Sequence, residues 1–219
     1  MRILIVAATS IEVAPVVASL REMSERGPRL TRYAHAAHDV DVLITGVGMV
    51  ATAAWCSHVL ALSRYDVALN FGVCGSFDHA LKPGDVVQVV TDRIAELGAE
   101  DGEAFLSIHE LNLPGEDGFT NVAPPANAAL GRLPTVNGIT VNTVHGNARS
   151  IAAVTERFRP QVESMEGAAF MQACLIHGVA FAQVRAVSNV VERRNRDAWK
   201  LADAIGVLGV TALSILDQA

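Results

Sequence analysis

The chain has 219 residues, of which 51% are hydrophobic and 18% charged, and its formal net charge is −6 at pH 7. Its basic residues are scattered, which excludes the clustered basic face that a nucleic-acid partner needs. The length predicts a single domain over residues 1–219. The apolar content exceeds what a monomer has to bury, so we expect a homo-oligomer.

The apolar segments at the two ends of the chain do not have the properties of membrane segments. The run at residues 2–8 is too short for a signal peptide and is typical of a buried strand. The stretch from Leu201 to Leu216 is interrupted by Asp203 and is shorter than the ~20 residues that a membrane span needs. The three cysteines cannot all pair and follow no metal-ligand spacing. We therefore expect a reduced, cytoplasmic setting with no membrane partner and no metal.

Apolar runs that alternate with helical periodicity predict an α/β chain. Strands are expected at residues 2–8, 40–45, 67–71, 86–90, 138–144 and 180–187, and helices at 11–25, 52–62, 150–158, 167–176 and 197–216. Ser150 should cap the third of these helices, and the last should turn Trp199 and an apolar stripe toward the sheet. Residues 96–125 show neither period and are expected to form a long loop near a subunit interface or the site mouth.

Two acids lie where a strand gives way to a helix. Glu12 follows the capping residues Thr9 and Ser10, and its position alone favours complementation of the helix dipole. Glu166 precedes a run of small residues that reads as a helix almost without charge. Such junctions open onto the crevice at the carboxyl ends of strands, where α/β folds bind ligands. For Glu166, ligand binding and a dipole effect of ~0.3–1 kcal/mol both stay open.

Residues 46–51 match the G-x-G-x-x-A fingerprint that binds dinucleotides after a strand. A nicotinamide or flavin enzyme would also need an acid at the carboxyl end of the next strand to hold the ribose. Asp66, the only candidate, precedes that strand and so lies at the wrong end of the sheet. After the strand, residues 71–76 read as a turn whose glycines let the backbone approach a ligand, which makes Gly72 and Val73 candidate binding residues.

The run Ser164-Met165-Glu166-Gly167-Ala168 resembles the Met-Glu motif of the purine nucleoside phosphorylase and methylthioadenosine nucleosidase superfamily. The resemblance covers nearly the whole chain, and residues 187–199 most resemble futalosine hydrolases. It implies a three-layer αβα sandwich with a central mixed, twisted sheet. It also implies a small-molecule nucleoside as the substrate and no cofactor.

The resemblance implies roles for particular residues. Met165 would pack on the ribose, and Glu166 would accept the protons of its hydroxyl groups. Glu12 matches the water-activating glutamate of the superfamily. Asn189 would hydrogen-bond the purine at its five-membered ring, with Ser188 beside it in the crevice.

The chain departs from its relatives at several positions. Phosphorylases hold phosphate with an arginine and a serine where this chain has Asn70 and Val73, so water is the expected nucleophile. Related nucleosidases have an aromatic residue that stacks on the purine near the position of Val144 and His145, which leaves the stacking of the base open. Adenine-specific nucleosidases have aspartate at the position of Asn189. An asparagine can donate to O6 of a 6-oxopurine and accept from a protonated N7, although a flipped amide would also serve adenine.

A basic run follows Asn189. Futalosine carries an aromatic carboxylate on its 5′ substituent, and arginine binds carboxylates in bidentate fashion. Arg193 and Arg196 are candidates for this contact, and a solvated basic turn explains the run equally well. We therefore expect an enzyme that cleaves futalosine to hypoxanthine and dehypoxanthine futalosine, as on the futalosine route to menaquinone. The alternatives are a methylthioadenosine/adenosylhomocysteine nucleosidase that releases adenine, and a catalytically silent nucleoside-binding protein.

Overall fold

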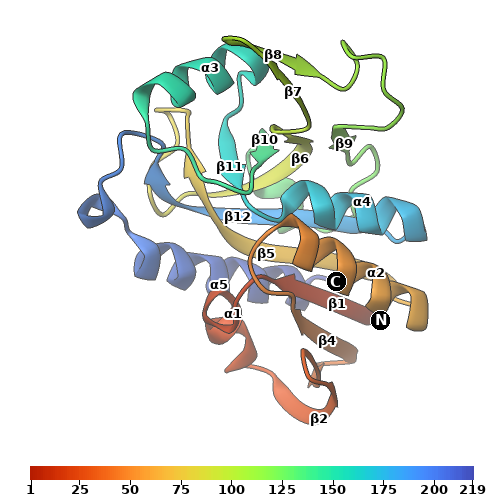
Figure 1. Ribbon diagram of the computed structural model, residues 1–219. Helices are drawn as coiled ribbons and strands as arrows, with labels where there is room; N and C mark the ends of the chain where they lie inside the picture. Colours follow the sequence, from red (N-terminus) through yellow and green to blue (C-terminus); the bar gives the residue numbers. More distant parts are fainter.

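The computed structural model describes residues 1–219 and contains a ten-stranded mixed sheet (Figure 1). Its strand order is β11-β10-β6-β12-β5-β1-β4-β3-β2, with β9 paired to β6, while β7 and β8 form a separate two-stranded sheet. The strands are β1 (Arg2–Ala7), β2 (Arg21–Gly27), β3 (Leu30–His35), β4 (His38–Ile44), β5 (Val67–Ser76), β6 (Val86–Ile94), β7 (Gly98–Asp101), β8 (Ala104–Ser107), β9 (Gly118–Thr120), β10 (Thr135–Thr140), β11 (Val162–Ser164) and β12 (Phe181–Val190). The helices are α1 (Ser10–Val17), α2 (Met49–Leu62), α3 (Ala148–Phe158), α4 (Gly167–His177) and α5 (Leu201–Asp217), with short 3₁₀ helices η1 (Leu130–Arg132) and η2 (Arg196–Ala198).

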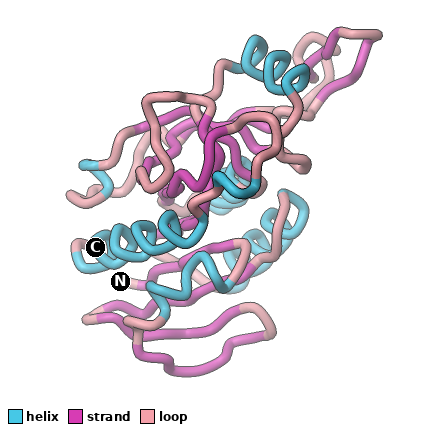
Figure 2. Tube along the Cα trace, turned by 90° about the vertical axis from the view of Figure 1, so that its left-hand side faces the viewer, coloured by secondary structure: helices cyan, strands magenta, loops and turns pink.

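Helices cover both faces of the sheet. Side chains alternate along a strand, so β1 contributes to two cores: Ile3 and Ile5 pack with α1 and α5, whereas Leu4 and Val6 pack with α2 and α4. Figures 1 and 2 show the β2–β3 hairpin and the β7–β8 hairpin at opposite ends of the molecule, beyond these layers. The predicted three-layer αβα sandwich with a mixed sheet is confirmed.

The strand directions create one edge where chain segments converge. β1 runs parallel to β4 and β5, and β5 runs parallel to β12, so the carboxyl ends of these strands meet. The sheet also curls, because β11 pairs with both β10 and β5, and this brings the start of α4 to the same place. Asp66 lies at the opposite edge, where its Oδ2 accepts from the Arg2 N–H at 2.7 Å. Its predicted position at the wrong end of the sheet is confirmed.

The first helix is shorter than predicted. α1 ends at Val17, and part of the expected helix forms β2, which pairs antiparallel with β3. All residues of β2 are exposed, so no buried face imposes a strand period on its sequence. Pairing with β3 overrides the helical propensity of residues such as Glu22 and Met23, because propensity is a weak local preference.

Other element boundaries also differ from the prediction. The turn expected at residues 71–76 is a continuation of β5, which stays paired with β12 as far as Ser76. α3 is capped by Asn147, whose Oδ1 accepts from the Arg149 N–H at 2.9 Å, and not by Ser150. α5 begins at Leu201, so Trp199 lies in the turn before the helix and not within it, while the apolar stripe of the helix packs against the sheet as predicted.

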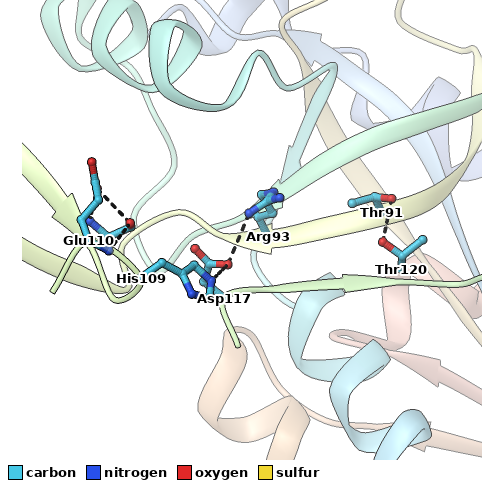
Figure 3. Close-up of polar contacts among 7 residues, drawn as sticks. Thr91, Arg93, His109, Glu110, Asp117 and Thr120 are labelled. Carbon is cyan, nitrogen blue, oxygen red and sulfur yellow. Dashed lines mark hydrogen bonds and ion pairs between the residues drawn. The ribbon is translucent and has the colours of Figure 1, made fainter. Parts of the chain in front are cut away.

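The long loop predicted at residues 96–125 contains three short strands, β7, β8 and β9. β9 pairs with β6, and Asp117 beside it accepts from Arg93 Nη1 at 3.3 Å and from His109 Nε2 at 3.1 Å (Figure 3). Strands of three or four residues are too short to show a period in the sequence.

The C-terminal helix is apolar along most of its length. The segment Arg196–Asp217 is long and apolar enough, by length and composition alone, to cross a membrane. One face of it is nevertheless buried against the sheet, with Ala204, Leu208 and Ala212 fully enclosed in the core. The core helix of a folded domain has the same composition, and α5 has that role here.

Asp41 on β4 is a buried charge that accepts hydrogen bonds from side chains of β1, β3 and the segment before β5. Its carboxylate accepts from Arg32 Nε at 2.7 Å, the Tyr65 hydroxyl at 2.8 Å and Arg2 Nη2 at 3.1 Å. Burial raises the pKa of Asp41, but the hydrogen bonds from Arg32, Tyr65 and Arg2 outweigh this effect and hold the pKa below its usual value.

We expect Asp41→Ala to lower the free energy of unfolding by about 2–4 kcal/mol, because it leaves Arg32 and Tyr65 without their acceptor. Urea denaturation measures this loss. Asp39→Ala is the matched control, because Asp39 is an exposed acid on the same strand and its loss should cost less than ~0.5 kcal/mol. Equal losses in the two variants would show that the Asp41 network does not stabilise the sheet.

Candidate active site

A cavity of about 380 Å³ opens where the carboxyl ends of β1, β5 and β12 meet the start of α4. Most of the predicted site residues line it: Glu12, Val73, Val144, Met165, Glu166, Ser188 and Asn189. The other lining residues are Ala8, Thr9, Ile11, Val47, Cys74, Gly75, Glu163, Ser164, Trp199, Leu201 and Ile205. The fold thus gathers segments that are far apart in the sequence.

Glu12 is held by two elements. Its Oε2 accepts from the Thr9 N–H at 2.9 Å and the Thr9 hydroxyl at 3.0 Å, which closes the first turn of α1. Its Oε1 accepts from the Val73 N–H on β5 at 3.3 Å. The carboxylate therefore completes the helix start, as its position suggests, and also lies on the cavity wall in a fixed orientation.

Glu166 lies immediately before α4 and points to the loop between β4 and α2. Its Oε1 accepts from the Gly48 N–H at 3.0 Å, so the glycine-rich loop that resembles a dinucleotide motif binds a side chain of the protein. Burial raises the pKa of Glu166, and the nearby charge of Glu12 adds to this. The Arg185 charge and the Gly48 N–H act in the opposite direction. The two carboxylates and one arginine thus form a single electrostatic unit.

Arg185 on β12 is the main feature that the sequence reasoning missed. It is only 1% exposed, and its Nη2 donates to Asn70 Oδ1 at 2.5 Å. Its partner across the strand pair is Gly72, where a Cβ atom would overlap Arg185 Nη1 and lie 3.0 Å from Glu12 Oε1. Gly72 therefore makes room for the arginine beside Glu12 and does not line the cavity. The signal in the sequence was an arginine that is the only charged residue of its strand.

A bulge in β12 positions Ser188 and Asn189. The register with β5 shifts between Val187 and Asn189, and such a bulge re-aims the side chains that follow. The Ser188 hydroxyl donates to Asn189 Oδ1 at 2.8 Å, and Asn189 Nδ2 donates to the Val190 carbonyl at 2.9 Å. An amide nitrogen carries two hydrogens, so Asn189 can still donate one into the cavity.

The aromatic wall of the cavity comes from an unexpected element. Val144 lines the cavity, whereas His145 does not, and its ring packs edge-on against Phe77. Trp199, in the turn before α5, also lines the cavity and is the only aromatic residue that does so. The polar residues before Trp199 were the signal that the helix begins after it.

Three predicted residues do not line the cavity: Gly72, which makes room for Arg185, and two arginines of the basic run. Arg193 and Arg196 are exposed and do not line it. Arg194 between them has its guanidinium 5.6 Å from the centre of the Trp199 ring, so it is the arginine of this run that contacts a lining residue. Binding of a substrate carboxylate by Arg193 or Arg196 stays a prediction.

A buried polar network supports the start of α4. The Thr140 hydroxyl donates to Asp92 Oδ1 at 2.8 Å and accepts from the Ala168 N–H at 2.8 Å, while Gln183 Nε2 donates to Asp92 Oδ2 at 2.9 Å. A Cβ atom at Gly167 would overlap Asp92 Oδ2, so a glycine is needed at this contact. The network fixes the helix end that follows the Met-Glu motif.

Burial raises the pKa of Asp92 to about 6, against the hydrogen bonds from Gln183 and Thr140. The native state therefore binds the proton of the Asp92 carboxyl group more tightly than the unfolded chain does. The resulting stability is present below pH ~4 and is lost as the pH rises to about 6.

We expect Asp92→Asn to gain about 3 kcal/mol in unfolding free energy relative to the parent between pH ~4 and ~7, because the amide cannot ionise. Urea denaturation across this range tests the prediction, and a difference that does not change with pH would contradict it.

Other places in the molecule do not gather the same chemistry. No group of three or more His, Cys, Asp or Glu side chains is arranged to hold a metal ion. A larger cavity, about 530 Å³, lies between the β7–β8 hairpin and α3 and contains none of the predicted site residues. We place the active site in the smaller cavity because Glu12, Glu166 and Asn189 meet there.

The arrangement fits cleavage of a bond between a sugar and a base. Buried carboxylates accept hydrogen bonds from sugar hydroxyls and favour positive charge that develops on the ring. An amide offers both a donor and an acceptor to a heterocycle, and apolar walls exclude bulk water.

Comparison with known proteins identifies the class. Residues 2–212 match the phosphorylase superfamily, and the chain belongs to this family. A futalosine hydrolase of Thermus thermophilus is 33% identical over 182 residues, which cover 80% of each chain. A 5′-methylthioadenosine/S-adenosylhomocysteine nucleosidase of Colwellia psychrerythraea is 26% identical over 171 residues, 72% of this chain and 69% of that one. The structure of a futalosine hydrolase of Helicobacter pylori has a TM-score of 0.86 at 15% identity, covering 100% of this chain and 98% of the other.

Within the superfamily, the chain is a nucleosidase, an enzyme that cleaves the N-glycosidic bond of nucleosides. This conclusion agrees with the cavity, in which the two carboxylates and the amide come from three different segments of the chain.

Proposed function

We propose that this nucleosidase hydrolyses futalosine to hypoxanthine and dehypoxanthine futalosine. The observation that carries the proposal is the amide of Asn189 on the cavity wall. A 6-oxopurine presents an acceptor at C6, to which the amide NH2 can donate, while the amide oxygen accepts from a protonated N7. The identity of 33% to a futalosine hydrolase, against 26% to a methylthioadenosine nucleosidase, supports the same choice.

In this proposal the residues on the cavity wall have defined roles. Glu166 accepts hydrogen bonds from the ribose hydroxyls, with Met165 against the apolar face of the sugar. As the glycosidic bond breaks, its electron pair leaves with the base, which takes a proton at N7 from solvent water, and the Asn189 amide oxygen accepts a hydrogen bond from this N7–H. Positive charge then develops on the ribose, and the carboxylates of Glu12 and Glu166 stabilise it. Glu12 orients a water molecule and takes its proton as the oxygen attacks the sugar.

The nucleophile in this proposal is water. No lysine or arginine lines the cavity, so a phosphate ion would find no cation on the wall. Arg185 is the nearest buried cation, and it already donates to Asn70. The Val73 N–H donates to Glu12, so this backbone donor is also in use.

The apolar end of the cavity suits the 5′ substituent of futalosine. Ile11, Val47 and Leu201 line it and are 65%, 57% and 43% exposed, so they form the mouth of the cavity. Trp199 offers an aromatic surface to the aromatic group of the substrate, with Arg194 above its ring. A methylthio group would fit the same apolar surface, which keeps methylthioadenosine as the second candidate substrate.

Incubation of the purified protein with futalosine in phosphate-free buffer, followed by chromatography of the products, tests this proposal. We expect hypoxanthine at a rate that added phosphate does not change. Adenine release from methylthioadenosine with no hypoxanthine from futalosine would favour the second candidate. Phosphate-dependent turnover would contradict hydrolysis. The predicted homo-oligomer and cytoplasmic location are part of the proposal and need their own measurements.

The role of Glu166 predicts a dependence on the sugar. Glu166→Gln should lower kcat/KM at least ~10-fold with a ribonucleoside, because the amide accepts fewer hydrogen bonds from the hydroxyls. The loss should be much smaller with a 2′-deoxynucleoside, which already lacks one partner. Equal losses with ribo and 2′-deoxy inosine would show that Glu166 does not bind the 2′-hydroxyl.

A further inference from the structure

Glu163 is a buried carboxylate of the cavity that has no role in the reaction described above. It belongs to β11, is 4% exposed and lines the cavity. Glu163 and Asn189 lie on the strands on either side of β5, and both are opposite Gly75. A Cβ atom at Gly75 would be 3.3 Å from Asn189 Nδ2 and 3.6 Å from Glu163 Cγ. The end of the cavity that receives the base therefore has an amide and a carboxylate that converge over the same glycine.

His145 fixes the orientation of this carboxylate. Glu163 Oε1 accepts from the His145 N–H at 3.1 Å, and Oε2 lies 2.7 Å from His145 Nδ1. An ionised carboxylate only accepts, so Nδ1 carries the hydrogen. Each carboxylate oxygen accepts more than one hydrogen bond, so acceptor capacity is left for a group in the cavity. Burial makes it costly to leave that capacity unused when a ligand displaces water.

We propose that Glu163 reads the six-membered ring of the purine by accepting a hydrogen bond from N1–H of a 6-oxopurine. A 6-oxopurine presents O6 as an acceptor and, next to it, N1–H as a donor. The Asn189 NH2 and the Glu163 carboxylate offer the complementary donor and acceptor in neighbouring positions. Adenine presents an acceptor at N1, which would face the carboxylate without a proton between them. The inference rests on the proposed function, whose 6-oxopurine substrate it explains in more detail.

This role is independent of the orientation of the Asn189 amide. A flipped asparagine exchanges its donor and acceptor, whereas an ionised carboxylate has no donor to offer in any orientation. Glu163 thus removes the ambiguity that Asn189 alone leaves between 6-oxopurines and 6-aminopurines. Sites that hydrogen-bond a polar group discriminate strongly against ligands that lack it, because their own groups are left unpaired.

The competing explanation is that Glu163 only anchors the loop between β10 and α3 through His145. A matched variant separates the two explanations. Glu96 is an exposed carboxylate outside this cavity that accepts from the N–H and the side chain of Asn142 in the same loop, at 3.2 and 3.1 Å. Glu96→Gln therefore weakens the anchoring of the loop and leaves the base end of the cavity unchanged.

Calorimetric binding of free bases to the 219-residue chain tests the proposal. The probes are hypoxanthine, adenine and 1-methylhypoxanthine, which keeps O6 and N7 but lacks N1–H. We expect the parent protein to bind hypoxanthine at least ~10-fold more tightly than either other base. Glu163→Gln, with its thermal transition checked, should reduce the preference for hypoxanthine over 1-methylhypoxanthine at least ~10-fold, whereas Glu96→Gln should keep it.

Three results would overturn the assignment of Glu163. The first is equal affinity of the parent protein for 1-methylhypoxanthine and hypoxanthine, a result that needs no variant to fold. The second is an unchanged preference in folded Glu163→Gln, and the third is an equal reduction of the preference in Glu96→Gln. If the parent protein prefers hypoxanthine to adenine in these cases, the proposed function stands and only the role of Glu163 fails. Tighter binding of adenine would contradict both.

Discussion

Replacing Glu12 with glutamine should lower kcat at least ~10²-fold and leave substrate affinity near the parent value. The amide has the shape of the carboxylate and its oxygen can still accept from the Thr9 N–H, so the cavity should keep its form. It cannot take a proton from water, and it no longer places a negative charge beside the ribose. Substrate binding and single-turnover rates, measured separately, show whether the loss of activity lies in turnover and not in binding.

The control for this variant is Glu25→Gln, because Glu25 is an exposed acid on β2 and does not line the cavity. Its kcat should equal that of the parent protein. A thermal transition near the parent value in Glu12→Gln shows that the start of α1 is still formed. Near-normal turnover in a folded Glu12→Gln protein would remove Glu12 from the mechanism.

The second large effect concerns the choice of base. Asn189→Asp should shift kcat/KM by at least ~10-fold from a 6-oxopurine nucleoside toward its 6-amino form. An ionised aspartate places an acceptor opposite O6. The hydrogen bond to O6 is then lost and two acceptors face each other, at a cost of about 1–3 kcal/mol. The 6-amino group gains an acceptor in the same place. The Ser188 hydroxyl, which now donates to the amide oxygen, can donate to the aspartate in the same way, whereas the Val190 carbonyl loses the donor that Asn189 gives it.

Futalosine and its 6-amino form are the substrates for this comparison, because they differ only at C6. The parent protein and the variant are measured with both, and the ratio of the two kcat/KM values is the readout. An unchanged ratio in a folded Asn189→Asp protein would mean that the base is read elsewhere. The choice of futalosine would then rest on Glu163 and on the sequence similarity.

The position of most site residues could be predicted because they follow strands. Glu12 comes after β1 and Asn189 lies near the end of β12, and the carboxyl ends of parallel strands meet at one edge. The Met-Glu motif is local, with Met165 and Glu166 between β11 and α4. A short stretch of sequence therefore contains enough information to place these groups, although not their hydrogen-bond partners.

Arg185 and Trp199 could not be placed because their environments depend on distant residues. Arg185 is buried only because Gly72, its partner on β5, leaves space for the guanidinium. Trp199 reaches the cavity because α5 starts two residues later, at Leu201. Neither contact has a periodic signal in the sequence, since each joins segments that only the folded sheet brings together.

The strands β2 and β9 were not predicted for the same reason. β2 pairs with β3 at the exposed edge of the sheet, and β9 pairs with β6 from inside the long segment at residues 96–125. These strands are exposed or only three residues long, so burial gives them no alternating pattern. Their pairing is decided by tertiary contacts, which local propensity does not report.

The central claim is that the cavity is built for a 6-oxopurine nucleoside with an extended 5′ group. The ratio of kcat/KM for futalosine to kcat/KM for methylthioadenosine, measured with the same preparation, tests it most directly. The account predicts a ratio of at least ~10 in favour of futalosine, with hypoxanthine as the purine product. A ratio below one, with adenine released from methylthioadenosine, would contradict it.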